Sequence, residues 1–222
     1  PITSNQDESV IFIGAAICGL KKDYIHPRSI PSKGIVIAQN CVRTRNIKRM
    51  LDPEFQPNWG SYFTNIDTIS PYEKKEEVLK KTLDFFYKVA GIPKENLILR
   101  VNSQDRELYS LASSQVQEKQ LETDQHPEIY YRHKIGIDEI KGKNFNFAIR
   151  HAQSGQYADV GNFIIFEDSS GKKFLEVGFG DTTILQLKYG LNHIMECYPF
   201  PKNRALNDDN KFKDCIITSL AC

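Results

Sequence analysis

The sequence predicts an α+β fold, an antiparallel β-sheet flanked by helices, in a single domain that spans residues 1–222. Segments with strand character outnumber helical ones, and most of them follow one another directly, which argues against a doubly wound parallel sheet. No internal repeat, low-complexity tract or linker divides the 222 residues. A chain of this length can bury one large hydrophobic core.

The first third of the chain predicts a β-hairpin. Residues 10–18 form an apolar run typical of a buried strand, and residues 22–33 contain two prolines and indicate a loop. Residues 34–42 are rich in β-branched side chains and predict a strand. A return strand over residues 59–69 would pair with it, and the connection between them begins with the basic residues 43–49.

A helix, a strand and a second helix are expected next. Ser70 and Pro71 suit the N-cap and first position of a helix that runs to residue 90 and stops at Gly91. Residues 97–101 predict a strand, and residues 104–119 predict a helix.

The remaining elements follow at short spacing. Residues 130–147 predict a loop with a short strand. Residues 161–167 and 173–177 predict a hairpin that turns at a Gly-containing loop. A helix is expected over residues 182–195, and a final short helix is expected from Asn210.

Composition excludes several classes of protein. Lys and Arg total 29 and Asp and Glu total 28, so the net charge of +1 gives no overall attraction to nucleic acid or to membranes. The apolar runs are far shorter than the ~20 residues that span a bilayer. The five cysteines and five histidines are scattered without metal-ligand spacing. We therefore expect a cytoplasmic protein with no disulfide framework and no metal held by its side chains.

Residues 175–185, which read LEVGFGDTTIL, carry the strongest functional signal. Glu176 precedes Gly178 and Gly180 where a strand passes into a helix. Two glycines so close together let a ligand or a facing strand approach the backbone, and the acidic residue before them is placed to meet an amine. Because Glu176 alternates with apolar neighbours, it also fits a solvent-facing strand position.

Five segments in order resemble the catalytic domain of alanyl-tRNA synthetases, a class II aminoacyl-tRNA synthetase family, over residues 10–198. They are NCVR at 40–43, AGIPKENL at 90–97, KGKNF at 141–145, VGNFIIF at 160–166 and EVGFG at 176–180. The first is similar to the start of motif two, and the last is similar to motif three. The resemblance implies the class II sheet in a stand-alone paralogue without tRNA-binding and editing domains.

The resemblance also implies a set of site residues. Arg43 would be the catalytic residue, because its permanent charge and forked donors suit the α-phosphate of ATP and the carboxylate of an amino acid. ATP binding would fall to Arg43, Phe63, Gly178 and Gly180. Amino-acid binding would fall to Asn162, Ile164 and Glu176. The implied substrates are ATP, with Mg²⁺ carried by its phosphates, and a small amino acid.

The chain departs from the family at several positions. Thr183 stands where motif three has the arginine that contacts the γ-phosphate, and Asn146 stands where the family has tryptophan. Arg132, Arg150 and Lys188 are candidate replacement cations, although structural or surface roles fit the two arginines as well. Arg43 at a strand end also fits a surface arginine. The motif-two loop reads TRNIKR at 44–49, without the Gly-Gly-Lys-His of the family, and residues 152–157 read AQSGQY in place of its Gly-Pro-Cys-Gly-Pro-Cys segment. The motif-one helix of the family has no counterpart.

Three interpretations of function follow. The first is an enzyme that forms an aminoacyl-adenylate from an amino acid and ATP and passes the aminoacyl group to a carrier protein, a small molecule or an RNA. The second is a catalytically degenerate paralogue that binds an amino acid or adenylate and regulates or scaffolds a partner. The third is one processed or excised part of a larger synthetase-like protein. As assemblies, a homodimer and an association with a larger synthetase-like subunit are both considered. The sequence names neither the amino acid nor the acceptor.

Overall fold

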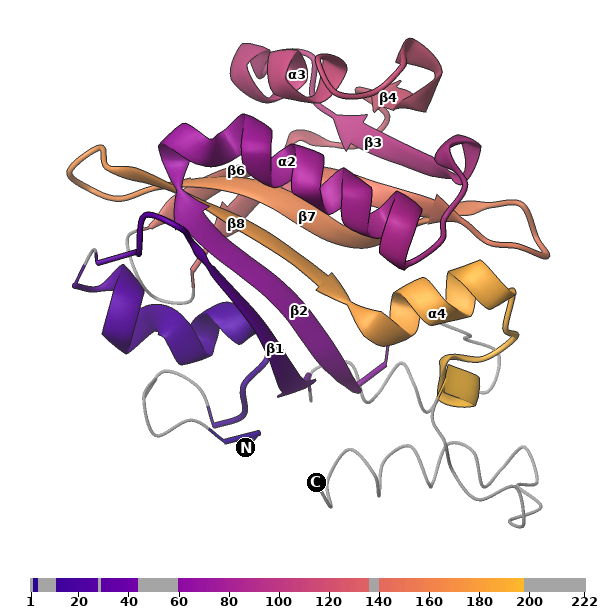
Figure 1. The fold of residues 1–222 in the computed structure, drawn as a ribbon, viewed down its shortest axis with the longest axis horizontal. Helices are drawn as coiled ribbons and strands as arrows, with labels where there is room; N and C mark the ends of the chain where they lie inside the picture. Colours follow the sequence, from indigo (N-terminus) through magenta and orange to yellow (C-terminus); the bar gives the residue numbers. More distant parts are fainter. Residues whose placement is uncertain (1, 4–10, 28, 44–59, 136–139, 198–222) are drawn as a thin grey trace.

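The structure is a computed structural model that describes residues 2–3, 11–27, 29–43, 60–135 and 140–197. Its framework is an eight-stranded sheet in the order β1-β2-β8-β7-β6-β3-β4, with β5 paired to β6 (Figure 1). The strands are β1 (Ile35–Val42), β2 (Tyr62–Pro71), β3 (Leu97–Val101), β4 (Leu121–Thr123), β5 (Arg132–Lys134), β6 (Lys141–Arg150), β7 (Tyr157–Glu167) and β8 (Lys173–Gly180). Every strand pair is antiparallel except β3–β4. The predicted fold class is confirmed.

In the described part of the chain, three α-helices pack on the sheet: α2 (Lys75–Asp84), α3 (Arg106–Ser113) and α4 (Asp181–Tyr189). Short 3₁₀ and π turns accompany them: η1 (Ala16–Leu20), η2 (Lys21–Ile25), η4 (Tyr72–Lys74), η5 (Phe85–Val89), η6 (Lys94–Asn96), η7 (Glu118–Gln120), η8 (Glu128–Tyr131) and η9 (Ile194–Cys197). Among the described residues, no helix has the length and apolar character needed to cross a membrane.

The two faces of the sheet differ in character because strand side chains alternate between faces. On one face, apolar side chains such as Phe145, Phe163 and Leu175 form the main core with α2, α3 and α4 (Figure 1). The opposite face carries polar side chains, and we call it the polar face. Strand register and alternation place on it Asn65, Asp67, Asn144, Asn146, Asn162 and Glu176. The sheet is therefore stabilised mainly from the side of the main core.

The N-terminal turns η1 and η2 pack against one end of the polar face. Ile17 and Ile25 join Ile164, Phe166 and Phe174 in a small second core. The predicted strand over residues 10–18 is therefore wrong. Ile13, Ala16 and Ile17 of this run are buried, and a short buried helical turn has the same composition as a buried strand. The loop predicted over residues 22–33 is also wrong in part, since η2 reaches Ile25.

The strands at 34–42 and 97–101 are confirmed almost to the residue, and the two predicted hairpins pair as expected. The other element boundaries shift. Ser70 and Pro71 belong to β2 and not to a helix cap, because their backbone still pairs with β8. The helix predicted over residues 104–119 ends at Ser113. Gly91 stops η5 with a φ of +64°, and Gly190 ends α4 with a φ of +63°, before the predicted residue 195.

The stretch at residues 130–147 also differs from the prediction. It holds η8, β5 and most of the long strand β6 instead of a loop with one short strand. The predicted helix from Asn210 and the basic connection after Arg43 lie outside the described residues.

Candidate functional site

Arg43 directly follows β1 and Phe63 lies near the start of β2, and their side chains are in contact. The Arg43 guanidinium lies over the Phe63 ring, 4.9 Å from its centroid. Its Nε donates to the carbonyl of Gly14 at 2.8 Å, and its backbone N–H donates to Ser61 O at 2.7 Å. Phe63 is buried with Ile13 and Cys41. Arg43 is therefore a permanent, half-buried cation that lies over Phe63, the ring that the resemblance places near adenine.

Glu176 does not face solvent but shares a buried position with Asp67. Asp67 is fully buried and Glu176 is 7% exposed. Burial raises the pKa of both carboxyls, and the charge of Asp67 raises that of Glu176 further. Glu176 and the backbone N–H groups of Thr68 and Ile17 lie near enough to Asp67 to oppose part of the rise in its pKa. None of them makes a hydrogen bond of standard geometry to either Asp67 oxygen. Arg43 is the nearby cation that lowers the pKa of Glu176.

The two glycines of the LEVGFG stretch lie beside these groups. A Cβ on Gly178 would lie 3.5 Å from Asn65 Nδ2 and 3.6 Å from Asp67 Cγ. A Cβ on Gly180 would lie 3.3 Å from the Phe63 ring. Both glycines are partly exposed. They therefore form a floor without side chains between Asp67 and Phe63.

A β-bulge brings Asp159 to the polar face together with Asn162. Phe147 pairs with Gly161 and Ala148 pairs with Asp159, so Val160 is an extra residue in β7. The bulge reverses the alternation of faces along the strand. Gly161 allows the close approach at the bulge, because a Cβ there would lie 2.2 Å from the carbonyl oxygen of Gly178.

Asparagine side chains extend from Asp159 across the polar face as an amide ladder, which consists of Asn146, Asn144 and Asn162. Asn146 Nδ2 donates to Asp159 Oδ2 at 3.2 Å. Asn146 Oδ1 accepts from Asn144 Nδ2 at 2.6 Å and from Asn162 Nδ2 at 2.5 Å. The ladder therefore connects a predicted amino-acid-binding residue, Asn162, to a carboxylate that the sequence analysis did not select.

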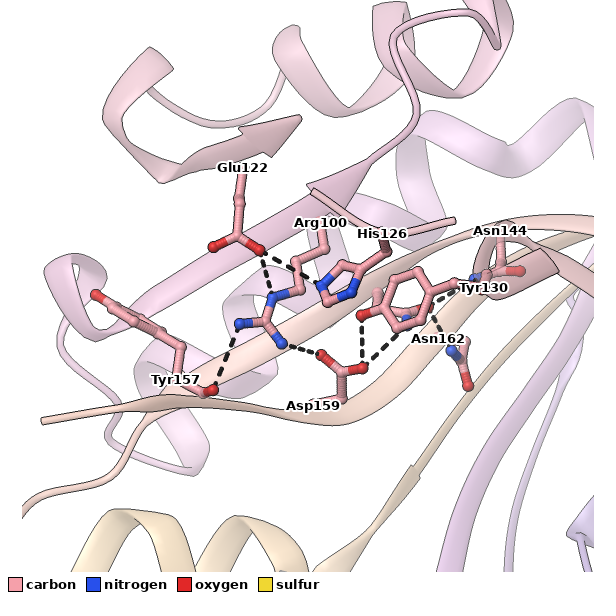
Figure 2. A network of polar contacts seen from close by, with 9 residues as sticks. Arg100, Glu122, His126, Tyr130, Asn144, Tyr157, Asp159 and Asn162 are labelled. Carbon is pink, nitrogen blue, oxygen red and sulfur yellow. Dashed lines mark hydrogen bonds and ion pairs between the residues drawn. The ribbon is translucent and has the colours of Figure 1, made fainter. Parts of the chain in front are cut away.

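Arg100 anchors the other end of this network (Figure 2). Its NH1 lies 2.8 Å from Asp159 Oδ1, and its Nε lies 2.7 Å from Glu122 Oε1. The hydroxyl of Tyr130 donates to Asp159 Oδ2 at 2.5 Å. Burial and the hydrogen bond to Asp159 raise the pKa of Tyr130, so this hydroxyl stays protonated. Arg100, Asp159 and Glu122 thus form an ion-pair network at the edge of the polar face.

His133 lies on β5 beside the ladder. Its Nδ1 is 2.9 Å from Asn144 Oδ1. Burial lowers the pKa of His133, the hydrogen bond to Asn144 opposes this effect, and the charge of Arg43 lowers the pKa further. The imidazole is therefore neutral at pH 7 and lies within electrostatic range of Arg43.

The remaining predicted residues are placed as follows. Ile164 packs in the small core with η1 and η2. Thr183 is buried in the first turn of α4. Arg132 pairs with Glu128, and Arg150 Nε donates to Gly155 O at 3.2 Å in the β6–β7 turn. Lys188 Nζ lies 5.0 Å from the centroid of the Tyr189 ring. Each candidate replacement cation thus contacts groups in its own part of the chain.

A pocket of about 570 Å³ opens beyond the ladder, between the end of β3 and β5. Gln104, Asp124, His126, Tyr131, Arg132 and Lys143 line it together with Asn144. Two of its charged groups are already paired, since Lys143 Nζ lies 3.2 Å from Asp105 Oδ2 and Arg132 pairs with Glu128. Among the described residues, no group of three or more His, Cys, Asp or Glu is arranged to hold a metal ion.

Comparison with known proteins identifies the fold. No family model matches the chain. It is similar in structure to PylSc, a pyrrolysyl tRNA synthetase of Desulfitobacterium hafniense, with a TM-score of 0.50 and 13% sequence identity over 89% of this chain. The fold is of the class II tRNA synthetase type. The chain spans 56% of the length of that synthetase, and at this identity the likeness concerns the fold alone.

A second solved structure is the RNA binding domain of threonyl-tRNA synthetase from Cryptosporidium parvum Iowa II. It has a TM-score of 0.45 and 11% identity over 83% of this chain and 50% of that one.

Sequence reasoning missed Asp67, Arg100, Asp159 and His133. A signal was present in two places. Residues 65–67 read NID, and residues 144–147 read NFNF, so polar side chains alternate with apolar ones as on a strand with one polar face. Asp159 could not be found in this way, because the bulge at Val160 breaks the alternation.

Proposed function

We propose that the chain forms an aminoacyl-adenylate from a small amino acid and ATP on the polar face of the sheet. A carboxylate oxygen of the amino acid attacks the α-phosphorus of ATP. The bond from that phosphorus to the bridging oxygen breaks, and pyrophosphate leaves with Mg²⁺. No protein nucleophile is required, so positioning and electrostatic stabilisation supply the catalysis.

One observation carries the proposal. A permanent cation, Arg43, lies within electrostatic range of the buried acid Glu176, on the same face as the floor of Gly178 and Gly180. The arginine suits the charge that develops at phosphorus and on the attacking carboxylate. The acid suits the α-ammonium, and the glycines leave room for the nucleotide. The likeness of the fold to tRNA synthetases and the alanyl-type motifs both support this assignment.

The acceptor would be a carrier protein, a small molecule or an RNA. We also propose that the protein is cytoplasmic and that it forms a homodimer or associates with a larger synthetase-like subunit.

A second candidate function is a binding module without catalysis. Thr183 replaces the motif-three arginine of the family and is buried at 9% exposure in α4, so the γ-phosphate lacks that contact. Arg43 also covers the Phe63 ring, where adenine would stack. In this alternative the polar face binds an amino acid or an adenylate and signals to a partner.

Amino-acid-dependent exchange of labelled pyrophosphate into ATP, run over the standard amino acids, separates the two functions. We expect exchange with one amino acid and a loss of about 10²–10³-fold in Arg43→Ala, because a charge-stabilising group is removed. Arg106→Ala is the matched control, since Arg106 is exposed on α3, which packs on the opposite face.

The alternative outcomes are equally clear. Calorimetric binding of an amino acid without any exchange would establish the binding module. An absence of both binding and exchange would refute both functions. Exchange that Arg43→Ala leaves intact would remove Arg43 from the catalytic role.

A further inference from the structure

We propose that Asp67, Glu176 and the side-chain oxygen of Asn162 form a subsite for a primary ammonium group above Gly178. The proposal rests on the proposed function and deepens it, because it makes the α-ammonium of the substrate the group that the site selects. Asp67 is the added determinant. It comes from β2, whereas the two residues that the resemblance assigns come from β7 and β8.

Strand register brings the three acceptors around one glycine. Gly178 pairs with Asp67 on one side and with Asn162 on the other. Glu176 precedes it by two residues on β8, so its side chain projects from the same face. Directly paired strand residues place their side chains side by side, and Gly178 has none. The space above Gly178 is therefore bordered by side chains from three strands, and the atom nearest to a Cβ placed on Gly178 would be Asn65 Nδ2 at 3.5 Å, followed by the Asp67 carboxyl group.

Asp67 is the second observation in favour of the subsite. Its side chain is fully buried, and neither of its oxygens makes a hydrogen bond of standard geometry within the described residues. Buried carboxyls in folded proteins are almost always hydrogen-bonded, because an unsatisfied one is costly. Its Oδ2 would lie 3.7 Å from a Cβ placed on Gly178. The unsatisfied group thus borders the space that the glycine leaves.

The amide ladder fixes which atom of Asn162 faces that space. A carboxylate can only accept hydrogen bonds, and Asp159 accepts from Arg100, Tyr130 and Asn146. Asn146 must therefore direct its Nδ2 to Asp159 and its Oδ1 to Asn162. Asn162 in turn must donate its Nδ2 and keep its Oδ1 as an acceptor. In Figure 2 this oxygen points away from the network.

The direction of the hydrogen bonds along the amide ladder also determines the tautomer of His133, which can be measured by spectroscopy. Asn144 donates its Nδ2 to Asn146, so its Oδ1 must accept from His133 Nδ1. The neutral imidazole therefore carries its proton on Nδ1. Asp159→Asn would allow the ladder to reverse, because an amide can also donate.

Access to the subsite is from the side of Gly178 and Asn162. Both residues are partly exposed, whereas Asp67 lies under the backbone of η1. A primary ammonium has three N–H donors, which matches the three acceptors. A quaternary ammonium has none, and a carboxylate has no donor to offer to these acceptors.

The probe is methylammonium chloride, with tetramethylammonium chloride as the comparison, titrated into ¹⁵N-labelled protein at constant ionic strength. We expect methylammonium to shift the amide signals of Gly178 and Asn162. Asp67→Asn should weaken this binding at least tenfold. Gly178→Ala should abolish it, because the methyl group fills the subsite while making only ordinary contacts. Gly19→Ala is the control, since a Cβ there meets nothing within 4 Å.

Three results would overturn the subsite: amide signals that shift equally with methylammonium and tetramethylammonium, amide signals that do not shift at all, and methylammonium binding that stays unchanged in both Asp67→Asn and Gly178→Ala. The amide ladder is tested separately by the ¹⁵N chemical shifts of the His133 ring, which report its tautomer. We expect the Nδ1–H tautomer in the wild type and in Gly19→Ala, and a change of tautomer in Asp159→Asn. Methylammonium binding that depends on Asp67, without pyrophosphate exchange, would refute the proposed enzyme but not the subsite. If pyrophosphate exchange occurs and Asp67→Asn leaves it unchanged, the subsite is refuted but the proposed enzyme is not.

Discussion

At the scale of single residues, Asp67 is the most unusual feature of the protein. A buried carboxyl without a standard hydrogen bond costs free energy when it ionises, and Asp67 lies beside a second buried acid, Glu176. Groups held in such positions cluster at functional sites, where stability is lower than it would otherwise be. The position of Asp67 is therefore consistent with a site that binds a cation.

The pH dependence of stability tests this view of Asp67. Burial raises its pKa from 3.8 to about 6, so the folded state favours the protonated acid. Its contribution to the free energy of unfolding is therefore present below about pH 4 and is lost as the pH rises through about 6. Glu176, Cys18 and Arg43 are the charged or titratable neighbours of this pair. We expect Asp67→Asn to stabilise the protein above this range by about 1–3 kcal/mol.

The measurement is the urea midpoint of the wild type and of Asp67→Asn across this pH range. Asp84→Asn serves as the control, because Asp84 is only partly buried and pairs with Lys88 of η5 at 3.0 Å at the end of α2. If the urea midpoints of the wild type and of Asp67→Asn change with pH by the same amount, Asp67 does not have the raised pKa that we assign to it.

At the scale of elements, the bulge in β7 decides the geometry of the polar face. Val160 is the extra residue, and it brings Asp159 to the same face as Asn162. Gly161 allows the strands to close around it, because no Cβ fits 2.2 Å from the carbonyl oxygen of Gly178. The bulge is therefore a structural requirement for the amide ladder.

We expect Gly161→Ala to destabilise the protein by about 1–3 kcal/mol or more, as overpacking does elsewhere. Gly178→Ala is the matched variant on the neighbouring strand, where the nearest atom would lie 3.5 Å away, and it should change stability little. Denaturant unfolding of both variants decides the question. Equal midpoints for the two variants would show that the bulge does not need glycine.

The elements that could be predicted are those whose local composition decides their structure. Residues 34–42 and 97–101 are β-branched and apolar, and both form the predicted strands. The run at residues 10–18 was predicted as a strand because a short apolar segment does not reveal its period. The pairing of Asp67 with Gly178 depends on the register of β2 against β8, which no local pattern contains.

At the scale of the whole molecule, the sheet separates stability from function. Helices α2, α3 and α4 close one face over a core of aromatic and aliphatic side chains (Figure 1). The other face carries Arg43, the Asp67–Glu176 pair and the amide ladder, and η1 and η2 cover one end of it. The predicted Arg43, Phe63, Asn162, Glu176 and two glycines all belong to this face or its edge, whereas Arg132 and Arg150 bind groups near their own strands.

The most direct test of the central claim is a crystal structure of the protein with 5′-O-(N-alanylsulfamoyl)adenosine, a stable analogue of an aminoacyl-adenylate. We expect the analogue on the polar face, with its sulfamoyl group at Arg43 and its ammonium above Gly178 between Asp67 and Glu176. Binding in the pocket lined by His126 and Tyr131, or no binding at all, would contradict the account.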